Sequence, residues 1–308
     1  MIICPDCAAA MCEPDALNCK DCGWKGEKRD GVAVYLSTQD RQDPILREYF
    51  ENYDRISADD LRRSILDERY LENQARNLAR SIPELRNRRV CDIGCGKGYL
   101  AKELVARGAE RVTVVDIAMS YLQRMSGEAF GAVIPILANA ENLPLADAFD
   151  IIVATDIMEH VLNVGSFMYA LNRALVVGGT AYVRVPYRES LLSYSPHLDC
   201  EYRFVHLRTF NEDTLRVYFE SAGFAIDGFK FDGYWLQRPR DFWQSGLLRQ
   251  RLYQRFQRAA TKRLGHYTDV TSWNQLLARM LMVPLEIVII ARKVKRIEKQ
   301  GKGAYVLR

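Results

Sequence analysis

Residues 89–118, RVCDIGCGKGYLAKELVARGAERVTVVDIA, decide the fold. An apolar run around Asp92 precedes glycines at positions 94, 96 and 98. A helical segment follows, and then a second apolar run that ends at Asp116. Strand, glycine loop, helix, strand and acid follow one another in this order at the ligand-binding end of doubly wound sheets. The stretch therefore predicts an α/β fold with a parallel sheet and a nucleoside site.

Length and composition favour one main domain with an appended module. The chain has 308 residues, 48% of them hydrophobic, and a formal net charge of +4, which does not by itself indicate nucleic acid. The first residues, MIICPDC, lack the basic and apolar regions of a secretory signal. The longest apolar run, residues 280–291, is broken by Pro284 and Glu286 and is shorter than the roughly 20 residues of a membrane span. We expect a soluble, cytoplasmic protein.

Two CxxC pairs lie near the N-terminus, Cys4 with Cys7 and Cys19 with Cys22. Each pair can form a tight turn that directs two thiolates to one point, and two such turns make the closed tetrahedral site that suits structural zinc. So short a segment has no core of its own, so the metal would supply its folding energy. We expect a zinc ribbon over residues 1–36, closed by a strand at 31–36. The alternative is a set of incidental reduced thiols.

Residues 37–82 are expected to be a polar linker followed by helices that cover the nucleoside site. Apolar residues recur there at spacings of three and four, which is typical of amphipathic helices. Tyr49, Tyr53 and Tyr70 belong to this pattern. They could line a pocket, but aromatic residues at helical spacing are more often part of the core, and we favour that interpretation.

The glycine loop departs from two well-known phosphate loops. The run Gly94-Cys-Gly96-Lys-Gly98 lacks the third glycine of the dinucleotide fingerprint, and no Ser or Thr follows Lys97 as in a nucleotide triphosphate loop. Asp116 lies 20 residues beyond Gly96, at the end of the next apolar run. It is therefore placed to accept hydrogen bonds from both hydroxyls of a ribose.

The segment DIGCGKGYL resembles motif I of the class I S-adenosylmethionine-dependent methyltransferases. Three later segments follow in the order of that family, namely NAENLPLADAFDIIVATDIMEHV, LNRALVVGGTAYVRVP and HLRTFNEDTLRVYFESAGF. The resemblance covers about residues 44–232 and a seventh strand at 283–292. It implies a Rossmann-like seven-stranded sheet of order 3-2-1-4-5-7-6 within residues 83–292, with a helical insertion at about 233–282. The residues that follow, 293–308, form a basic tail. The cysteine pairs resemble zinc ribbons that precede some methyltransferase domains.

The resemblance also implies the contacts of the cofactor, S-adenosylmethionine. Its methionine part would meet Asp92, Gly94, Cys95 and Gly96, its ribose Asp116, its adenine Ile117, Asn139 and Ala140, and its sulfonium the backbone of Thr155. Many relatives carry Asp at the position of Asn139. An amide oxygen can still accept a hydrogen bond from the adenine amino group, with weaker charge assistance.

Substrate residues are expected in the loop 187–206, because it leaves the fifth strand at the carboxyl edge of the sheet. A hydroxyl acceptor needs a base near neutral pKa, which favours histidine. His160 is the first candidate, His206 and His197 come next, and His266 is a weak one. The alternative for His160 is a role in fixing its loop. His197, Asp199, Glu201 and His206 could instead bind a divalent metal, although a polar surface loop is the favoured interpretation.

The insertion contains a predicted amphipathic helix at 242–264. Arg251, Arg255, Arg258 and Lys262 share one face, and Leu252, Phe256 and Ala260 share another. Such a helix can meet a membrane surface or a phosphate-bearing substrate. The alternative is a core-packed helix with a solvated basic face.

We expect methyl transfer to a small molecule, such as a sugar, glycan precursor, lipid-linked or secondary metabolite, with O-methylation favoured. One alternative is an RNA or protein methyltransferase that uses the ribbon and the basic helix to dock its substrate. The segment ATDIMEH lacks the Pro-Pro-aromatic run typical of base amino-group methylation. An alternative of another class is a non-catalytic scaffold that binds partners.

Overall fold

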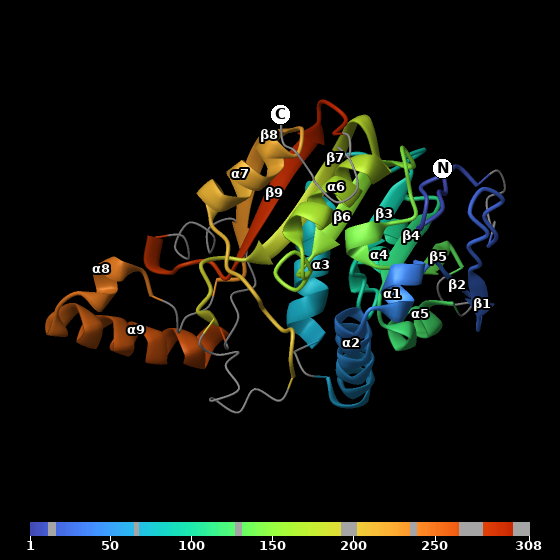
Figure 1. Cartoon of the computed structure of the whole chain (residues 1–308). Helices are drawn as coiled ribbons and strands as arrows, with labels where there is room; N and C mark the ends of the chain where they lie inside the picture. Colours follow the sequence, from blue (N-terminus) through green and yellow to red (C-terminus); the bar gives the residue numbers. More distant parts are fainter. Residues whose placement is uncertain are drawn as a thin grey trace.

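Figure 1 shows the computed structural model, in which helices cover both faces of one mixed sheet. The structure describes residues 1–11, 17–64, 68–126, 131–191, 202–234, 239–264 and 280–297, and of residues 260–264 it describes the backbone only. The expected α/β Rossmann-like fold is confirmed.

The sheet has nine strands in the described part of the chain. Their spatial order is β1 (Glu27–Arg29), β2 (Val32–Val34), β5 (Val133–Leu137), β4 (Val112–Asp116), β3 (Val90–Ile93), β6 (Phe149–Thr155), β7 (Leu175–Pro186), β9 (Glu286–Lys293) and β8 (Phe224–Asp232). In this order, the strands from β2 to β7 run parallel to one another. Strand β1 is antiparallel to β2, and β9 is antiparallel to both of its neighbours. The seven strands from β5 to β8 have the order 3-2-1-4-5-7-6. These are the seven strands expected for the domain, in the expected order, and β1 and β2 from residues 27–34 extend the sheet to nine strands.

The two extra strands come from the N-terminal segment. The strand expected to close the zinc ribbon, β2, pairs antiparallel with β1 and also parallel with β5 at the edge of the sheet. Ala33 and Val34 lie opposite Ile136 and Leu137. The prediction of a closing strand was therefore incomplete, because the exposed edge of β5 offers backbone groups that a short apolar strand can pair with.

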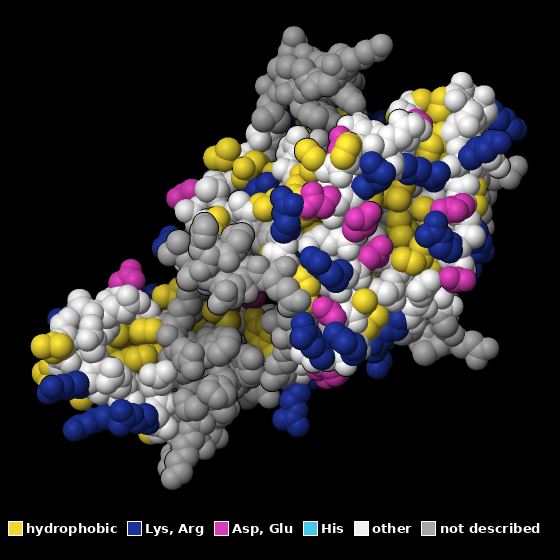
Figure 2. Space-filling model, turned by 60° about the horizontal axis from the view of Figure 1, so that its bottom comes forward, with side chains coloured by type: hydrophobic (Ala, Val, Ile, Leu, Met, Phe, Trp, Pro, Cys, Tyr) yellow, Lys and Arg dark blue, Asp and Glu magenta, His cyan; other side chains and the backbone are white. Residues whose placement is uncertain are grey.

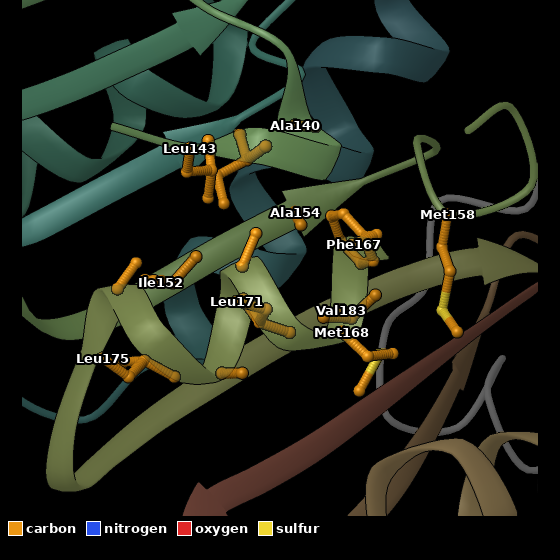
Figure 3. Packing of buried hydrophobic residues seen from close by; sticks show 14 of the residues in the cluster. Ala140, Leu143, Ile152, Ala154, Met158, Phe167, Met168, Leu171, Leu175 and Val183 are labelled. Atoms are coloured by element: carbon orange, nitrogen blue, oxygen red, sulfur yellow. The ribbon is translucent and has the colours of Figure 1, made fainter. Parts of the chain in front are cut away.

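The core lies in two layers, one on each face of the sheet. All four residues of β3 are buried, as expected for a parallel strand covered on both faces. One face is covered by α3 (Glu68–Ser81), α4 (Tyr99–Ala106) and α5 (Met119–Met125), and the other by α6 (Val164–Ala174) and α7 (Glu212–Ser221). Figure 3 shows Phe167 and Leu171 of α6 against Ile152, Ala154 and Val183 of the strands.

Two helices from the N-terminal part of the chain lie near the carboxyl edge of the sheet. The expected polar linker forms the short helix α1 (Thr38–Gln42), because Ser37 and Asp40 make a reciprocal capping box. Asp43 then caps α2 (Pro44–Arg63), which has proline in its first turn. Figure 1 places α2 below the sheet, and α2 packs against α5.

The cysteine-rich segment packs on the main body. Ile3 N donates to the carbonyl of Pro144 at 2.9 Å, and Asn142 Nδ2 donates to the carbonyl of Pro5 at 2.8 Å. Trp24 stacks on Tyr35 with ring centroids 5.8 Å apart. This segment and the sheet therefore share one hydrophobic core.

The insertion falls between β8 and β9, as expected. It contains α8 (Asp241–Gln244) and α9 (Leu247–Leu264), which extend away from the sheet in Figure 1. Among the helices of the described residues, none combines the length and the apolar character needed to cross a bilayer.

Candidate active site

A cavity of about 650 Å³ opens at the carboxyl ends of β3, β4 and β6. Parallel strands of an open α/β sheet bind ligands at this edge. Six of the nine residues expected at the cofactor line the cavity, namely Gly94, Gly96, Asp116, Ile117, Asn139 and Ala140. The described lining residues do not include Asp92, Cys95 or Thr155, and Asp156 and Ile157 lie on the wall just after Thr155.

The glycine loop forms the floor of one half of the cavity, which we call the donor half. Gly94 and Gly96 have positive φ angles of 72° and 50°, which side chains rarely adopt. A Cβ on Gly94 would lie 2.9 Å from Ile157 Cδ1, whereas a Cβ on Gly96 would enter open space. Glycine at these positions therefore keeps the backbone close to whatever occupies the donor half.

Asp116 joins the loop to the end of β4. Its carboxylate accepts from the backbone N–H groups of Gly96 at 3.0 Å, Ile117 at 2.8 Å and Ala118 at 2.9 Å. Burial raises the pKa of this carboxyl, and the three N–H donors oppose that shift. The carboxylate thus organises the loop and also faces the cavity, where it can accept from a ligand hydroxyl.

Asp92 lies under the loop with its carboxyl fully buried. Neither oxygen has a hydrogen-bond partner among the described residues. Burial, followed by the charge of Asp116, raises the pKa of Asp92 to about 7, and Arg184 opposes this. A buried acceptor without a donor is costly, so its position next to the loop fits a ligand that brings a donor.

The side chain of Asn139 is held by the N-terminal helix. Its Nδ2 donates to Asp40 Oδ1 at 2.8 Å, and its Oδ1 accepts from the backbone N–H of Glu141 at 2.9 Å. Asp40 Oδ2 accepts from the backbone N–H of Ser37 and from its hydroxyl. Asp40 thus explains the amide at position 139, because Asp there would face a second carboxylate.

The other half of the cavity, which we call the acceptor half, contains two histidines. The rings of His160 and His206 are perpendicular, with centroids 4.6 Å apart. Tyr53 Oη lies 2.9 Å from His160 Nδ1 and donates to the carbonyl of Phe204 at 2.8 Å. Because Tyr53 has one proton, which goes to the carbonyl, its oxygen accepts from Nδ1–H of His160. This leaves the lone pair of His160 on Nε2.

The two histidines differ in their charged neighbours. His206 Nδ1 is hydrogen-bonded to the carboxylate of Glu189. Burial, and then repulsion from His206, lower the pKa of His160 to about 3. His160 therefore stays neutral near pH 7, whereas a carboxylate accompanies His206.

Carboxyl groups dominate the rest of the acceptor half. Glu159 is fully buried, and neither of its oxygens is hydrogen-bonded within the described chain. Burial, and then the charge of Asp156, raise its pKa well above the usual range. The same causes raise the pKa of Glu286 to about 8, and Tyr70 donates to Glu286 Oε1 at 3.0 Å. Arg184 is buried and pairs with Asp156.

The expectations for the acceptor half have different outcomes in the structure. Tyr49, Tyr53 and Tyr70 line the cavity, which the core interpretation did not predict. His197 lies outside the described residues, as do Asp199, Glu201 and His266, so the metal hypothesis for that loop remains a hypothesis. The pairing of Glu189 with His206 was not expected from the sequence. The missed residues carry no local motif, because they meet only in the folded chain.

The four N-terminal cysteines converge as expected. One sulfur from each of Cys4, Cys7, Cys19 and Cys22 lies within 4.8 Å of the others, and the six cysteines of the described residues are free thiols. The Sγ atoms of Cys4 and Cys22 are 3.5 Å apart, and those of Cys7 and Cys19 are 3.6 Å apart. Four thiolates about 2.3 Å from one zinc ion would be separated by roughly 3.8 Å. The donor set and its spacing therefore fit a zinc ion.

Curated relatives match parts of this chain. A protein of Mycolicibacterium smegmatis named "Probable S-adenosylmethionine-dependent methyltransferase" is 31% identical over 141 residues, 46% of this chain and 53% of that protein. A tRNA U34 carboxymethyltransferase of Shewanella is 32% identical over 105 residues, 32% of this chain and 31% of that one. A ubiquinone biosynthesis O-methyltransferase of Azorhizobium caulinodans is 36% identical over 97 residues, 29% of this chain and 37% of that one. The chain thus spans about half or less of these relatives.

Solved structures share the fold. A chain from the structure titled "Complex between the Haloferax volcanii Trm112 methyltransferase activator and the putative methyltransferase" superposes with a TM-score of 0.54 at 16% identity. The superposition covers 79% of this chain and 98% of that chain, and at this identity it supports the fold alone. The family model described as "Methyltransferase domain" (Methyltransf_23) matches residues 47–227, more than half of the chain. The chain therefore belongs to this family of class I methyltransferase domains.

Proposed function

We propose that the chain transfers a methyl group from S-adenosylmethionine to a hydroxyl of a small molecule. One observation carries the proposal: the glycine loop with Asp116 and the His160–His206 pair line the same cavity. A binding scaffold has no need of a second half with histidines and buried carboxyls. The bound cofactor would supply an electrophilic methyl group on its sulfonium.

The donor half would hold this cofactor through backbone and acid groups. Asp116 would accept from the ribose hydroxyls, and Asp92 would accept from the amino group of the methionine part, directly or through the loop. Gly94, Cys95 and Gly96 would allow close approach, and the backbone of Thr155 would border the sulfonium. The adenine would contact Ile117, Asn139 and Ala140.

The acceptor half is suited to a molecule that donates hydrogen bonds. Glu159, Glu189 and Glu286 present acceptor oxygens to the cavity. A hydroxyl-rich acceptor would bring donors to both oxygens of Glu159 and to Oε2 of Glu286, which are buried and have no hydrogen-bond partner among the described residues. This favours O-methylation of a polyhydroxylated molecule.

We assign the base role to His206, with His160 in a positioning role. The carboxylate of Glu189 on Nδ1 leaves Nε2 of His206 as the proton acceptor and stabilises the imidazolium that forms. In the proposed step, Nε2 of His206 would take the proton of the acceptor hydroxyl as the hydroxyl oxygen bonds to the methyl carbon, and the bond between that carbon and the sulfonium sulfur would break, with the sulfur leaving as a neutral thioether. His160 stays neutral and can hold the acceptor through Nε2. His197 remains a further candidate.

The test uses radiolabelled S-adenosylmethionine and fractionated cell extract. Label should enter a small-molecule or lipid fraction, and the Asp116→Ala variant should give none. Label in RNA or protein would replace the proposed acceptor with the docking alternative. Binding of cofactor without labelling of any fraction would favour the scaffold alternative.

We also propose that the N-terminal cysteines hold one structural zinc ion. The thiolates would be closed around it, so it would have no open position for chemistry. Metal analysis should give one zinc per chain, and Cys19→Ser should lose the metal and expose the segment to proteolysis. Retained zinc together with an unchanged proteolysis pattern would refute this assignment.

A further inference from the structure

Helix α9 presents an apolar and a cationic strip that the described protein leaves uncovered. Leu248, Leu252 and Phe256 are 73%, 50% and 41% exposed. These values contradict the core-packed interpretation of the helix, since core side chains are almost completely buried. We propose that α9 docks the protein on an anionic membrane surface.

The charges of α9 are all of one sign. Its 18 residues, LLRQRLYQRFQRAATKRL, contain six cationic residues and no acidic one. At 3.6 residues per turn, Arg251, Arg255 and Arg258 lie within about 60° of one another, and the three exposed apolar residues follow within about 80° on the adjoining arc. We call these six residues the docking face. An apolar strip beside a basic one is the pattern of helices that lie in the plane of a membrane interface.

The opposite side of α9 is anchored, which orients the docking face outward. Tyr253 is buried, and its ring lies 5.9 Å from that of Trp243 in α8. At the margin of the docking face, Arg249 lies over the ring of Phe242 at 4.3 Å, a second contact that joins α9 to α8. The helix pair therefore forms a small unit that turns one side inward and the docking face to solvent. Figure 2 shows hydrophobic and basic side chains close together on the end of the molecule that carries these helices.

The insertion joins the body at the wall of the cavity. Pro239 and Met282 form a bridge at its stem, and Leu285, three residues later, lines the cavity. Leu285 N also donates to the carbonyl of Gly233 at 3.1 Å. The membrane would thus lie near the edge at which the acceptor enters. That the acceptor is then a lipid-linked or membrane-held molecule rests on the proposed function.

Other occupants fit the docking face less well. A second copy of the chain would bring arginines against arginines. Single-stranded RNA would use the arginines but leaves leucine side chains without a role, since its bases stack on aromatic rings and its phosphates bind cations. A bilayer with anionic headgroups complements both strips at once.

The experiment is flotation of the full chain, without cofactor or acceptor, on phosphatidylcholine vesicles with and without phosphatidylglycerol. Binding is expected only with the anionic lipid and should weaken with salt. Replacing Leu248, Leu252 and Phe256 by Ser should lower the partition coefficient at least about tenfold. Replacing Arg251, Arg255 and Arg258 by Gln should lower it about a hundredfold. The matched controls are Val217→Ser on α7, where Val217 is 66% exposed, and Arg86→Gln, and both should leave binding unchanged.

Two results would overturn the proposal. One is a wild-type chain that does not float, and the other is flotation that the Ser variants leave intact. Salt-sensitive RNA binding without vesicle binding would assign the arginines to RNA instead. Cofactor calorimetry and circular dichroism on the same variants should match the wild type. Vesicle binding without methyl transfer would refute the proposed function alone, and methyl transfer without vesicle binding would refute only the docking.

Discussion

The two halves of the cavity are built in different ways. The donor half is made of strand ends and the turns that follow them, so its residues are close to one another along the chain or belong to adjacent strands. The acceptor half is assembled from α2, the turn after β6, the segment around Phe204 and the start of β9. Tyr53 and His160, which are in hydrogen-bond contact, are 107 residues apart.

This difference separates the features that are common to the fold from those that are specific to one protein. Backbone N–H groups, glycines and one acid can hold a nucleoside wherever the same strand order recurs. The acceptor half depends on side chains from segments that vary in length and sequence. Variants should therefore affect the two halves independently.

The largest effect is expected for Asp116→Ala. The change removes an acceptor for the ribose and releases the N–H groups of Gly96, Ile117 and Ala118. Calorimetry should show cofactor affinity lower by at least about 100-fold, which corresponds to two hydrogen bonds to a charged group. Asp227→Ala, which removes a surface ion pair with Arg292, is the control. Unchanged affinity in the Asp116 variant would contradict the assignment of the donor half.

The next effect should be confined to the acceptor half. His206→Ala should lower turnover about 100-fold, the usual contribution of a general base, without changing cofactor affinity. His160→Gln should lower turnover less, because it removes a positioning group. A larger loss in the His160 variant than in the His206 variant would reverse the two roles, and a change in cofactor affinity would show that the halves are coupled.

Asn139→Asp tests the link between the donor half and α1. Two carboxylates would meet where Asn139 now donates to Asp40 at 2.8 Å. The free energy of unfolding should fall by about 2 kcal/mol, measured by denaturant titration. Adding Asp40→Asn should restore most of it, because a donor again faces an acceptor. If the effects of the two substitutions on the free energy of unfolding simply add, the two side chains do not interact.

The smallest effect concerns pH and the buried acid of the donor half. Since the pKa of Asp92 is raised to about 7 when folded, from an unfolded value near 4, the native state holds a proton between these limits that the unfolded state lacks. Stability is therefore lost as pH rises from about 4 to 7. Glu159 and Glu286 contribute with the same sign, and His160 opposes them, because its lowered pKa makes stability rise with pH between about 3 and 6.5.

Asp92→Asn removes one of these titrations. The cofactor-free variant should melt about 2–4 °C above the wild type at pH 8, and the difference should shrink at pH 5. Its cofactor affinity should nevertheless be lower. A variant that melts below the wild type at pH 8 would show that Asp92 stabilises the fold rather than serving the ligand.

The sequence by itself determined the central sheet and most of the donor half. The order of strand, glycine loop and acid is local, and buried parallel strands are readable as short apolar runs. Asp116, the glycines and the convergence of the four cysteines follow from spacing within a few residues or from adjacent strands. The chemistry of these residues depends little on contacts with distant segments of the chain.

Only the tertiary structure decided the remainder, because it depends on contacts between distant segments. The edge of β5 pairs with β2, and β2 pairs with β1, which no local pattern indicates. Asp40 explains Asn139 only when α1 lies against the turn after β5. The tyrosines of α2 and α3 line the cavity because the helices face its opening. The sequence predicted the helical periodicity of α9, but whether its apolar strip is buried depends on what packs against it.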